Sequence, residues 1–337
     1  MHASLTPQSV RERHSVARAE HIAKLSAALG AHSSSLPRAS DEFTAQPLQR
    51  LLNKLSQGEA NHFHPPERVE GPRGEVYSDT QSPTVVVLVS ATGGVGRSTL
   101  AAALASGLQR EGHPALALDL DPQNALRHHL CPGFDLPGIG ATSLLNQSWQ
   151  ALPQRGFAGC RVIAFGETDL AQQHSLNRWL GQDVEFLGKR LARLGLNGQH
   201  TVFIDVPAGN TVYLRQAMSV ADAVLVVVRP DAASFRRLAK MDEVLAPYCA
   251  GESPAQRFYA INQVDGGCAF SQDMAGVFRL HLGDAVLGEV HCDRAISQAR
   301  AYGRDPLDPA LNSVGCQQVN ALCRALMAQR RQSITRH

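Results

Sequence analysis

The chain has 337 residues, of which 44% are apolar and 18% are charged, and its 32 Lys and Arg nearly balance its 30 Asp and Glu. This composition excludes a chain that is disordered throughout, and no apolar run reaches the roughly 18 residues typical of a membrane-spanning helix. The near-neutral charge argues against broad coating of nucleic acid. The start of the sequence shows no secretory signal and the seven Cys show no Cys-x-x-Cys spacing, so we expect a cytoplasmic protein with reduced, mostly buried thiols.

The first 82 residues contain Ser-, Pro- and Gly-rich stretches and few β-branched residues, which predicts a low-order extension. Two stretches within it, residues 10–29 and 42–55, have apolar residues at helical spacing. Neither is long enough to form its own core, so the extension is either a tail with nascent helices or a segment that becomes ordered on a partner. The pair His62 and His64 is more typical of a solvated loop than of a metal site.

From Thr84 the pattern changes to short, apolar, β-branched runs, most of them separated by amphipathic stretches of helix length. The runs are 84–90 (TVVVLVS), 115–120 (ALALDL), 161–165 (RVIAF), 201–206 (TVFIDV), 223–228 (AVLVVV) and 258–262 (FYAIN). Unbroken apolar strands are typical of a parallel sheet that helices cover on both faces. We therefore predict a doubly wound α/β domain with a mostly parallel sheet at 84–330, followed by a flexible tail at 331–337.

The first of these strands runs into a glycine-rich loop, and a helical stretch begins directly after it. Glycines let backbone N–H groups approach an anion without a Cβ clash, and the helix N-terminus adds positive potential. The predicted phosphate-binding residues are Gly93, Gly94, Val95, Gly96, Arg97, Ser98 and Thr99. Arg97 would place its cation against the β- and γ-phosphates, and the Ser98 hydroxyl would bind Mg²⁺. The loop departs from the usual GxxxxGK[ST] pattern at Ala91, which replaces a Gly, and at Arg97, which replaces the Lys.

Carboxylates follow two of the predicted strands at their C-terminal ends, where ligands lie in such sheets. Asp119 lies near the end of the second run and Asp121 directly follows it, while Asp205 lies at the end of the strand that precedes Pro-Ala-Gly. We expect Asp121 to orient an attacking water, Asp119 to reach the water shell of a metal, and Asp205 to hold Mg²⁺ through a water. A lone Asp at a strand end is usually a turn former or a helix cap, but three of them with a phosphate loop favour a nucleotide site.

These motifs resemble those of a known family. TGGVGRST, LDLDPQN, FIDVPAGN and AINQVD occur in the order seen in the ParA/MinD family of P-loop ATPases, and the resemblance covers residues 84–330. It implies ATP and Mg²⁺ as cofactors, a MinD-like fold, and a homodimer that sandwiches the nucleotide. Asn262 falls where the family's Asn reads adenine, and residues 288–307 look like the family's adenine-side loop and the helix that follows it.

Within that family the chain is most similar to the BcsQ branch, ATPases encoded in bacterial cellulose synthase operons. The stretches that carry this resemblance are DLDPQNALRHHL, RVIAFGE and VHCDRAISQARAYGRDPL. The resemblance implies an accessory protein that supports secretion and localisation of the cellulose synthase complex. Its partners would then be other subunits of that machinery at the inner membrane, and the helix predicted at 43–55 is a candidate docking element for one of them.

Thr92 departs from the family at the position of the signature Lys, which reaches across the dimer to the partner's nucleotide. Thr has neither the length nor the charge for that contact, and a missing cation beside a transferring phosphate removes transition-state stabilisation. Asp121, Asp205 and Ser98 are retained. We therefore expect ATP to bind with Mg²⁺ and to favour the dimer, while hydrolysis is slow or absent.

Two other activities of the same family are alternatives. A partitioning ATPase that binds DNA needs surface cations on its late helices, for which the candidates are Arg236, Arg237, Lys240, Arg324, Arg330 and Arg331. A MinD-like membrane switch needs an interfacial helix, for which the candidates are Val319, Leu322, Leu326 and Met327 near the end of the chain. A solvated helix face and a helix packed on the sheet explain these residues more simply, so DNA and direct membrane binding are not favoured. An iron–sulfur reductase is disfavoured because VPAGNTVYL, after Asp205, has no Cys.

Overall fold

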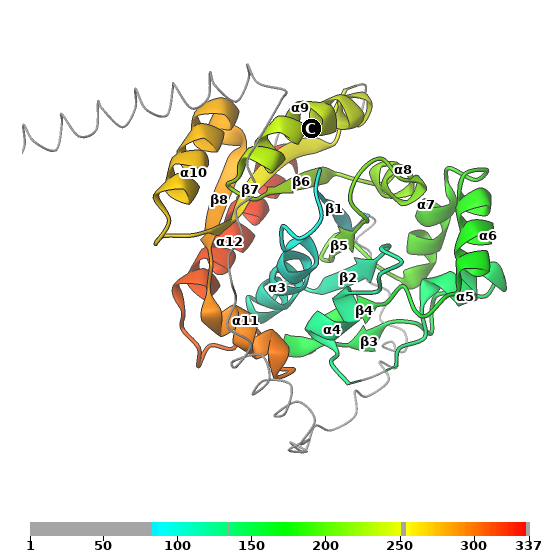
Figure 1. Cartoon of the computed structure of the whole chain (residues 1–337). Coiled ribbons are helices and arrows are strands. Elements are labelled where there is room, and N and C mark those ends of the chain that lie inside the picture. Colours follow the sequence, from blue (N-terminus) through cyan, green and yellow to red (C-terminus); the bar gives the residue numbers. More distant parts are fainter. Residues whose placement is uncertain (1–81, 134, 251–253, 335–337) are drawn as a thin grey trace, which may run out of the picture. The chain divides into compact units, whose positions relative to one another are not determined.

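The structure is a computed structural model that describes residues 82–133, 135–250 and 254–334 (Figure 1). The predictions for the N-terminal extension, including its two helices and its His pair, lie outside these residues. The described part is built on an eight-stranded sheet, nearly all of it parallel, with helices on both faces. This arrangement confirms the predicted doubly wound α/β fold.

The predicted apolar runs form the inner strands of this sheet. The strands are β1 (Thr84–Val89), β2 (Ala115–Asp119), β3 (Gln154–Arg155), β4 (Arg161–Ile163), β5 (Thr201–Asp205), β6 (Ala223–Val228), β7 (Gln256–Val264) and β8 (Val286–His291). Their order is β3-β4-β2-β5-β1-β6-β7-β8, and each neighbouring pair is parallel except β3 and β4. In this register Asp205 lies beside both Leu88 and Asp119, so the end of β1 meets the acids of β2 and β5 at one edge.

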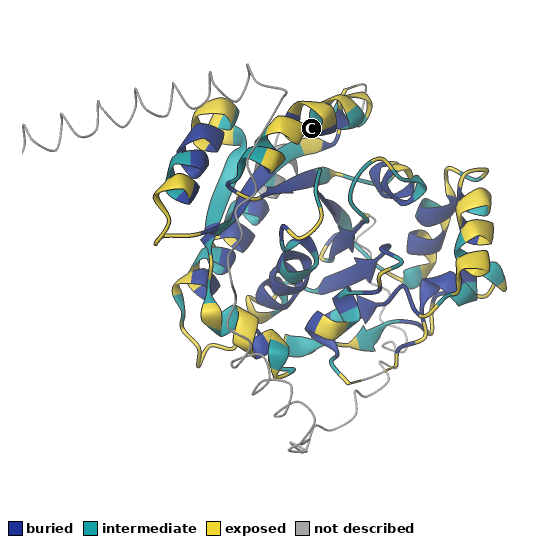
Figure 2. Ribbon diagram, viewed as in Figure 1, coloured by how far each residue is buried: buried dark blue, intermediate teal, exposed yellow. Residues whose placement is uncertain are grey.

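Helices cover the sheet on both faces, and alternate residues of each strand point to opposite sides. The helices are α3 (Arg97–Arg110), α4 (Leu126–Leu130), α5 (Ile139–Leu144), α6 (Leu170–Leu180), α7 (Phe186–Leu191), α8 (Val212–Met218), α9 (Ala232–Leu245), α10 (Ala269–Leu282), α11 (Arg294–Ala301) and α12 (Val314–Ile334). Leu88 of β1 joins Leu104 of α3 and Leu322 of α12 in one hydrophobic cluster. The alternate residue Val87 is also fully buried, so the other face is covered as well (Figure 2).

Two edge strands, β3 and β8, lie outside the predicted runs. The resemblance assigned residues 288–291 to a loop, and this was wrong, because they belong to β8; the loop begins at Cys292 and α11 follows it. An edge strand pairs on one side only, and of the β8 residues only Val290 is buried. The sequence VLGEVH is therefore mixed in polarity, with Gly and Glu inside it, and does not show the continuous apolar pattern of an inner strand.

The last helix packs on the sheet. Val319, Leu322 and Leu326 of α12 are buried against α3 and β8, which agrees with the favoured interpretation of this segment. The exposed Arg324 forms an ion pair with Glu111 at 3.3 Å. The helix runs to Ile334, past the predicted domain end at residue 330. Among the described residues, no helix combines the length and the apolarity needed to cross a membrane.

None of the cysteines forms a disulfide. The buried ones are Cys131, Cys160, Cys316 and Cys323, while Cys249 is partly buried and Cys268 and Cys292 are exposed. Burial raises the pKa of the Cys131 thiol to about 12, so this side chain behaves as a small apolar residue rather than as a reactive thiolate. The expectation of mostly buried thiols therefore agrees with the structure.

Candidate nucleotide-binding site

The glycine-rich loop connects the end of β1, near the centre of the sheet, to the N-terminus of α3. Its backbone turns at Gly94 (φ +75°) and Gly96 (φ +82°), a conformation that favours glycine. The end of β7 braces the loop, because Asn262 Nδ2 donates to the Val95 carbonyl at 2.8 Å and Gln263 Nε2 donates to the Gly94 carbonyl at 3.3 Å. A Cβ at Gly96 would lie 2.5 Å from Asn262 Nδ2, so only glycine fits there without a shift of its neighbour.

A cavity of about 1010 Å³ opens over this loop. It is lined by all the predicted phosphate-loop residues from Gly93 to Thr99 and by Asp121. Three predicted residues, Asp119, Asp205 and Asn262, do not line it and are buried. The volume lies at the upper end of the range of about 300–1000 Å³ that is usual for ligand pockets, which suits a ligand of nucleotide size.

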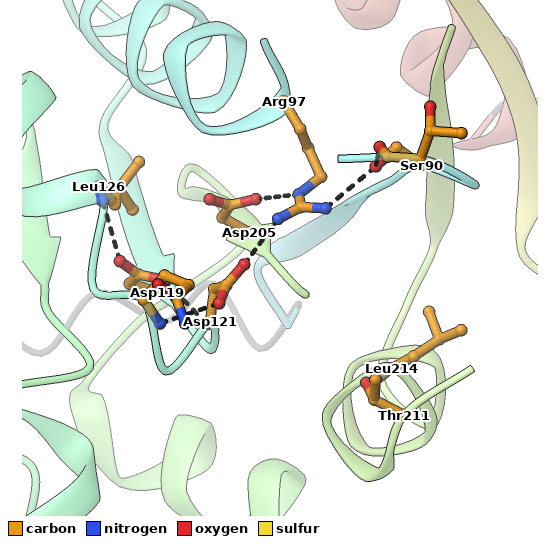
Figure 3. A network of polar contacts seen from close by, with 10 residues as sticks. Ser90, Arg97, Asp119, Asp121, Leu126, Asp205, Thr211 and Leu214 are labelled. Atoms are coloured by element: carbon orange, nitrogen blue, oxygen red, sulfur yellow. Dashed lines mark hydrogen bonds and ion pairs between the residues drawn. The ribbon is translucent and has the colours of Figure 1, made fainter. Parts of the chain in front are cut away.

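Arg97, the first residue of α3, directs its guanidinium into the acids at the strand ends (Figure 3). Its Nε donates to Asp205 Oδ1 at 2.5 Å, Nη2 donates to Asp121 Oδ2 at 2.8 Å, and Nη1 donates to the Ser90 hydroxyl at 3.0 Å. The Arg97 side chain is only 9% exposed. Its three contacts join α3 to the ends of β1, β2 and β5. The predicted contact of Arg97 with phosphates stays a prediction.

Asp119 is fully buried and both of its carboxylate oxygens are engaged. Oδ1 accepts from the Asp121 N–H and Oδ2 accepts from the Leu126 N–H, each at 2.9 Å (Figure 3). Burial, together with the negative charge of Asp205, raises the pKa of Asp119 well above its usual value. In this geometry Asp119 shapes the turn that carries Asp121, and its predicted place in the water shell of a metal stays a prediction.

Asp205 has one oxygen that the protein leaves without a partner. Oδ1 accepts from Arg97, while Oδ2 is buried and has no hydrogen-bond partner in the described part of the chain. Burial raises the pKa of Asp205, against the opposing effects of the Arg97 charge and of the neighbouring Ser98 hydroxyl. A buried acceptor without a donor is costly, and a metal-bound water would satisfy it. Ser98 and Asp205 are therefore suited to hold Mg²⁺ between loop and sheet.

Asn262 contacts the loop, whereas the next residue, Gln263, lines the cavity. The Asn262 amide donates to the Val95 carbonyl, as described above, and the Asn262 side chain is buried beside Gly96. Gln263, which has a left-handed backbone (φ +59°), lines the cavity instead. The structure thus gives Asn262 a role in fixing the loop, and its predicted contact with adenine stays a prediction.

Several lining residues lie outside the predicted set. Tyr213 and Arg215 of α8 line one part of the cavity, and His129 of α4 and Arg300 of α11 also line it. Tyr213 and Arg215 could have been found, because they lie at the end of the VPAGNTVYL stretch that follows Asp205 or directly after it. His129 and Arg300 lie in two of the stretches that carry the BcsQ resemblance, but nothing in the sequence points them to this cavity, since their place depends on how α4 and α11 pack.

Comparison with known proteins agrees with this fold and site. A family model described as "Cellulose biosynthesis protein BcsQ" matches residues 84–327, which include the whole sheet and the glycine-rich loop. The chain belongs to the BcsQ family. The BcsQ protein of Salmonella typhimurium is 27% identical over 228 residues, which make up 66% of this chain and 85% of that protein. The resemblance to the BcsQ branch that the motifs predict is therefore confirmed.

Solved structures of ParA/MinD ATPases share the fold. A plasmid partition protein from Borrelia burgdorferi, bound to AMPPNP, superposes with a TM-score of 0.60 at 17% identity and covers 73% of this chain and 99% of its own. MinD from Pyrococcus horikoshii, complexed with Mg-ADP, superposes with a TM-score of 0.59 at 18% identity and covers 72% of this chain and 96% of its own. The BcsQ-family domain described here thus has the ParA/MinD type of P-loop fold.

Proposed function

We propose that residues 84–330 form an ATP-binding domain that dimerises with ATP and Mg²⁺, hydrolyses ATP slowly or not at all, and assists the bacterial cellulose synthase and secretion machinery. The observation that carries the proposal is the cavity of about 1010 Å³ over the glycine-rich loop of a BcsQ-family domain. The loop lines this cavity and leads into the N-terminus of α3, and backbone N–H groups of such a loop and helix end are the usual ligands of nucleotide phosphates.

The residues present fit a Mg²⁺ ion. Ser98 and the unpartnered Oδ2 of Asp205 would supply oxygen ligands for the ion. Within the described residues, no group of three His, Cys, Asp or Glu side chains is placed to hold a metal by itself. Proteins usually bind Mg²⁺ through one or two side chains, waters and the phosphates of the substrate. When bound, the ion would neutralise phosphate charge.

Slow hydrolysis is supported by the residues around the predicted water position. Asp121 Oδ2 accepts from Arg97 and Oδ1 accepts from the Gln123 N–H, so this carboxylate is held in place at the cavity wall. Thr92 also lines the cavity, where the family's Lys would bring a cation. Thr92 offers no positive charge to the transition state. The loss of such a cation costs several kcal/mol in phosphoryl transfer, which lowers the rate on the order of 10³-fold or more.

The family supports the proposed assembly and location. BcsQ proteins bear the description of cellulose biosynthesis, and the ParA/MinD relatives include a MinD protein solved in complex with MinC. We infer a nucleotide-sandwich homodimer that remains cytoplasmic and is recruited to the inner membrane or the cell pole through other cellulose secretion subunits. The extension at 1–82 is the proposed docking segment for one of them.

Light scattering coupled to size exclusion tests the dimer on the full chain. With Mg–ATP the mass should double relative to Mg–ADP, and an equal mass in both nucleotides would contradict an ATP-driven dimer. Steady-state turnover should lie far below about 1 per second, the lower end of the range that is typical of kinases. Turnover above that rate which disappears in Asp121→Ala would overturn slow hydrolysis. Thr92→Lys, which restores the missing cation, should raise the rate.

The cellulose role is tested in the organism that carries the gene. Deletion should abolish extracellular cellulose, measured by dye binding, and a chain with Ser98→Ala should fail to restore it. Lys240→Ala, on the exposed face of α9, is the matched control and should restore it fully. Normal cellulose in the deletion strain would contradict this role, and a steep salt-dependent affinity of the pure chain for DNA would favour the partitioning alternative.

A further inference from the structure

The cavity over the phosphate loop has three arginines in its described lining, and they differ in what they contact. They are Arg97, Arg215 and Arg300, and the one carboxylate beside them in the lining is Asp121. All three nitrogens of the Arg97 guanidinium donate to protein oxygens, at 2.5–3.0 Å. The guanidinium groups of Arg215 and Arg300 form no hydrogen bond or ion pair with the rest of the described chain, and both side chains are exposed.

Arg215 stands on a firmly anchored helix. Thr211 caps α8 by accepting the Leu214 N–H at 3.1 Å, and Leu214 is buried. Gln216, the residue after Arg215, is buried and bonded on both sides of its amide: Nε2 donates to the Leu180 carbonyl at 2.8 Å, and Oε1 accepts from the Leu187 N–H at 3.1 Å. The backbone that carries Arg215 is therefore fixed while its cation is free in the cavity, an arrangement that suits a binding group.

The neighbouring Tyr213 supplies an independent sign of a ligand. Its side chain is only 4% exposed and lines the same cavity, yet its buried hydroxyl has no hydrogen-bond partner in the described part of the chain. Burial raises the pKa of the Tyr213 hydroxyl to about 12, and the negative charge of Asp121 adds to this shift. A buried hydroxyl without a partner costs free energy, which a ligand oxygen at this wall would recover.

Arg300 reaches the cavity from another element. In Figure 1, α11, which carries it, and α8 lie on either side of α3. The adjacent Ala299 is buried, and Asp293 caps the helix by accepting the Ala295 N–H at 2.7 Å. The charge of Arg300 lies close enough to His129 of α4 to help lower the pKa of that imidazole. His129 stays neutral at pH 7, so it does not supply a cation to the cavity.

We propose that Arg215 and Arg300, rather than Arg97, supply the side-chain cations that bind the terminal phosphates of the nucleotide. Arg97 is held by Asp121, Asp205 and Ser90, and Thr92 has no charge. The free guanidinium groups then provide the charge-assisted hydrogen bonds that a polyphosphate requires, and Tyr213, which lines the same cavity, adds a hydroxyl donor. This inference rests on the proposed nucleotide binding and names the side chains that bind the terminal phosphates.

Calorimetric titration of the full chain with ATP, AMP and inorganic tripolyphosphate tests the assignment. Arg215→Gln and Arg300→Gln should each weaken ATP and tripolyphosphate about tenfold or more, since a charge-assisted contact to phosphate is lost. AMP should change by less than about threefold, because it lacks the terminal phosphates. Arg215→Lys should recover part of the loss, and the salt dependence of ATP binding should fall in both Gln variants.

Arg236→Gln, on the exposed face of α9 and outside the cavity, is the matched control and should bind as the unaltered chain does. A double variant of Arg215 and Arg300 that binds ATP within about twofold of the unaltered chain would overturn the inference and return the role to Arg97 or the loop backbone. If the unaltered chain binds tripolyphosphate but not ATP, and tripolyphosphate binding weakens in both Arg215→Gln and Arg300→Gln, the proposed function would be contradicted and the inference supported. Failure to bind either probe would overturn both.

Discussion

Two regions of the cavity carry arginines whose surroundings differ. We call the region around Arg97 the floor, and the regions of α8 and α11 that carry Arg215 and Arg300 the walls. On the floor, Arg97 is buried and donates to Asp121, Asp205 and Ser90, which belong to three strand ends or the turns after them. On the walls, Arg215 and Arg300 are exposed, and their guanidinium groups have no hydrogen-bonded or ionic partner in the described chain. A buried, fully engaged cation mainly holds structure, whereas an exposed and unengaged one is available to a ligand. The two sets should therefore respond to mutation in different ways.

The largest difference should appear when the arginines of the floor and the walls are neutralised. Arg97→Gln should lower the free energy of unfolding by about 3–5 kcal/mol, because it leaves Asp121 and Asp205 buried without their cation. Arg215→Gln should change it by no more than about 0.5 kcal/mol, as is usual for an exposed side chain. Urea unfolding of the unaltered chain and of the two variants measures both changes in the free energy of unfolding. A loss below about 1 kcal/mol for Arg97→Gln would mean that its ion pairs do not stabilise the floor.

The loop that forms the floor should be sensitive to a single methyl group. Gly96→Ala should cost roughly 2–4 kcal/mol, because it combines a positive φ with a Cβ placed 2.5 Å from Asn262 Nδ2. Gly94→Ala is the matched control: its φ is also positive, but nothing lies within 4 Å of the added carbon, so only the backbone cost of about 1 kcal/mol or more remains. Thermal unfolding compares them. Equal losses would show that Asn262 does not constrain the loop.

Acid should weaken the domain through His129. Burial, helped by the charges of Arg300 and His128, lowers its pKa to about 3, whereas the unfolded chain titrates near 6.5. The unfolded state therefore binds the proton more readily, and stability that is present above pH 6.5 should fall on acidification, by at most about 1.4 kcal/mol per pH unit. His129→Gln should flatten this slope between pH 6.5 and 5. The exposed His128→Gln should leave most of it, and an unchanged slope in His129→Gln would contradict the assignment.

The smallest effect concerns the wall that carries Arg215. Thr211→Ala removes the cap of α8 and should cost about 1 kcal/mol of stability, while Thr211→Ser keeps the hydroxyl and should cost little. Because the cap helps to fix the helix under Arg215, the Ala variant should also weaken ATP binding slightly more than the Ser variant. Unfolding and titration of the two variants give the comparison, and identical behaviour would show that the cap does not support this wall.

The sheet and its phosphate loop could be predicted from the sequence because inner strands are apolar along their whole length. β1, β2, β5 and β6 are buried on both faces, and their runs of Val, Leu and Ile record this directly. β8 could not be predicted, since an edge strand buries only part of its surface. The predicted site residues from Gly93 to Thr99 meet Asp121 at one cavity because neighbouring parallel strands end at the same edge.

The direction of a side chain is what the sequence could not supply. A cation at position 97 suggested a phosphate contact, but the fork of a guanidinium fits two carboxylates equally well, and here it engages Asp121 and Asp205. Similarly, Asn262 was predicted to contact adenine, but its amide donates to the Val95 carbonyl. Arg300 lies far along the chain from the loop and reaches the cavity only through the packing of α11, so no local pattern could reveal it.

The most direct test of the central claim is calorimetric titration of the full chain with ATP in the presence of Mg²⁺, repeated with EDTA and with Ser98→Ala. We predict saturable binding of one ATP per chain that weakens about tenfold or more when Mg²⁺ is removed or when the Ser98 hydroxyl is lost. The absence of saturable binding, or an ATP affinity that neither change alters, would contradict a Mg²⁺–nucleotide site at the end of β1.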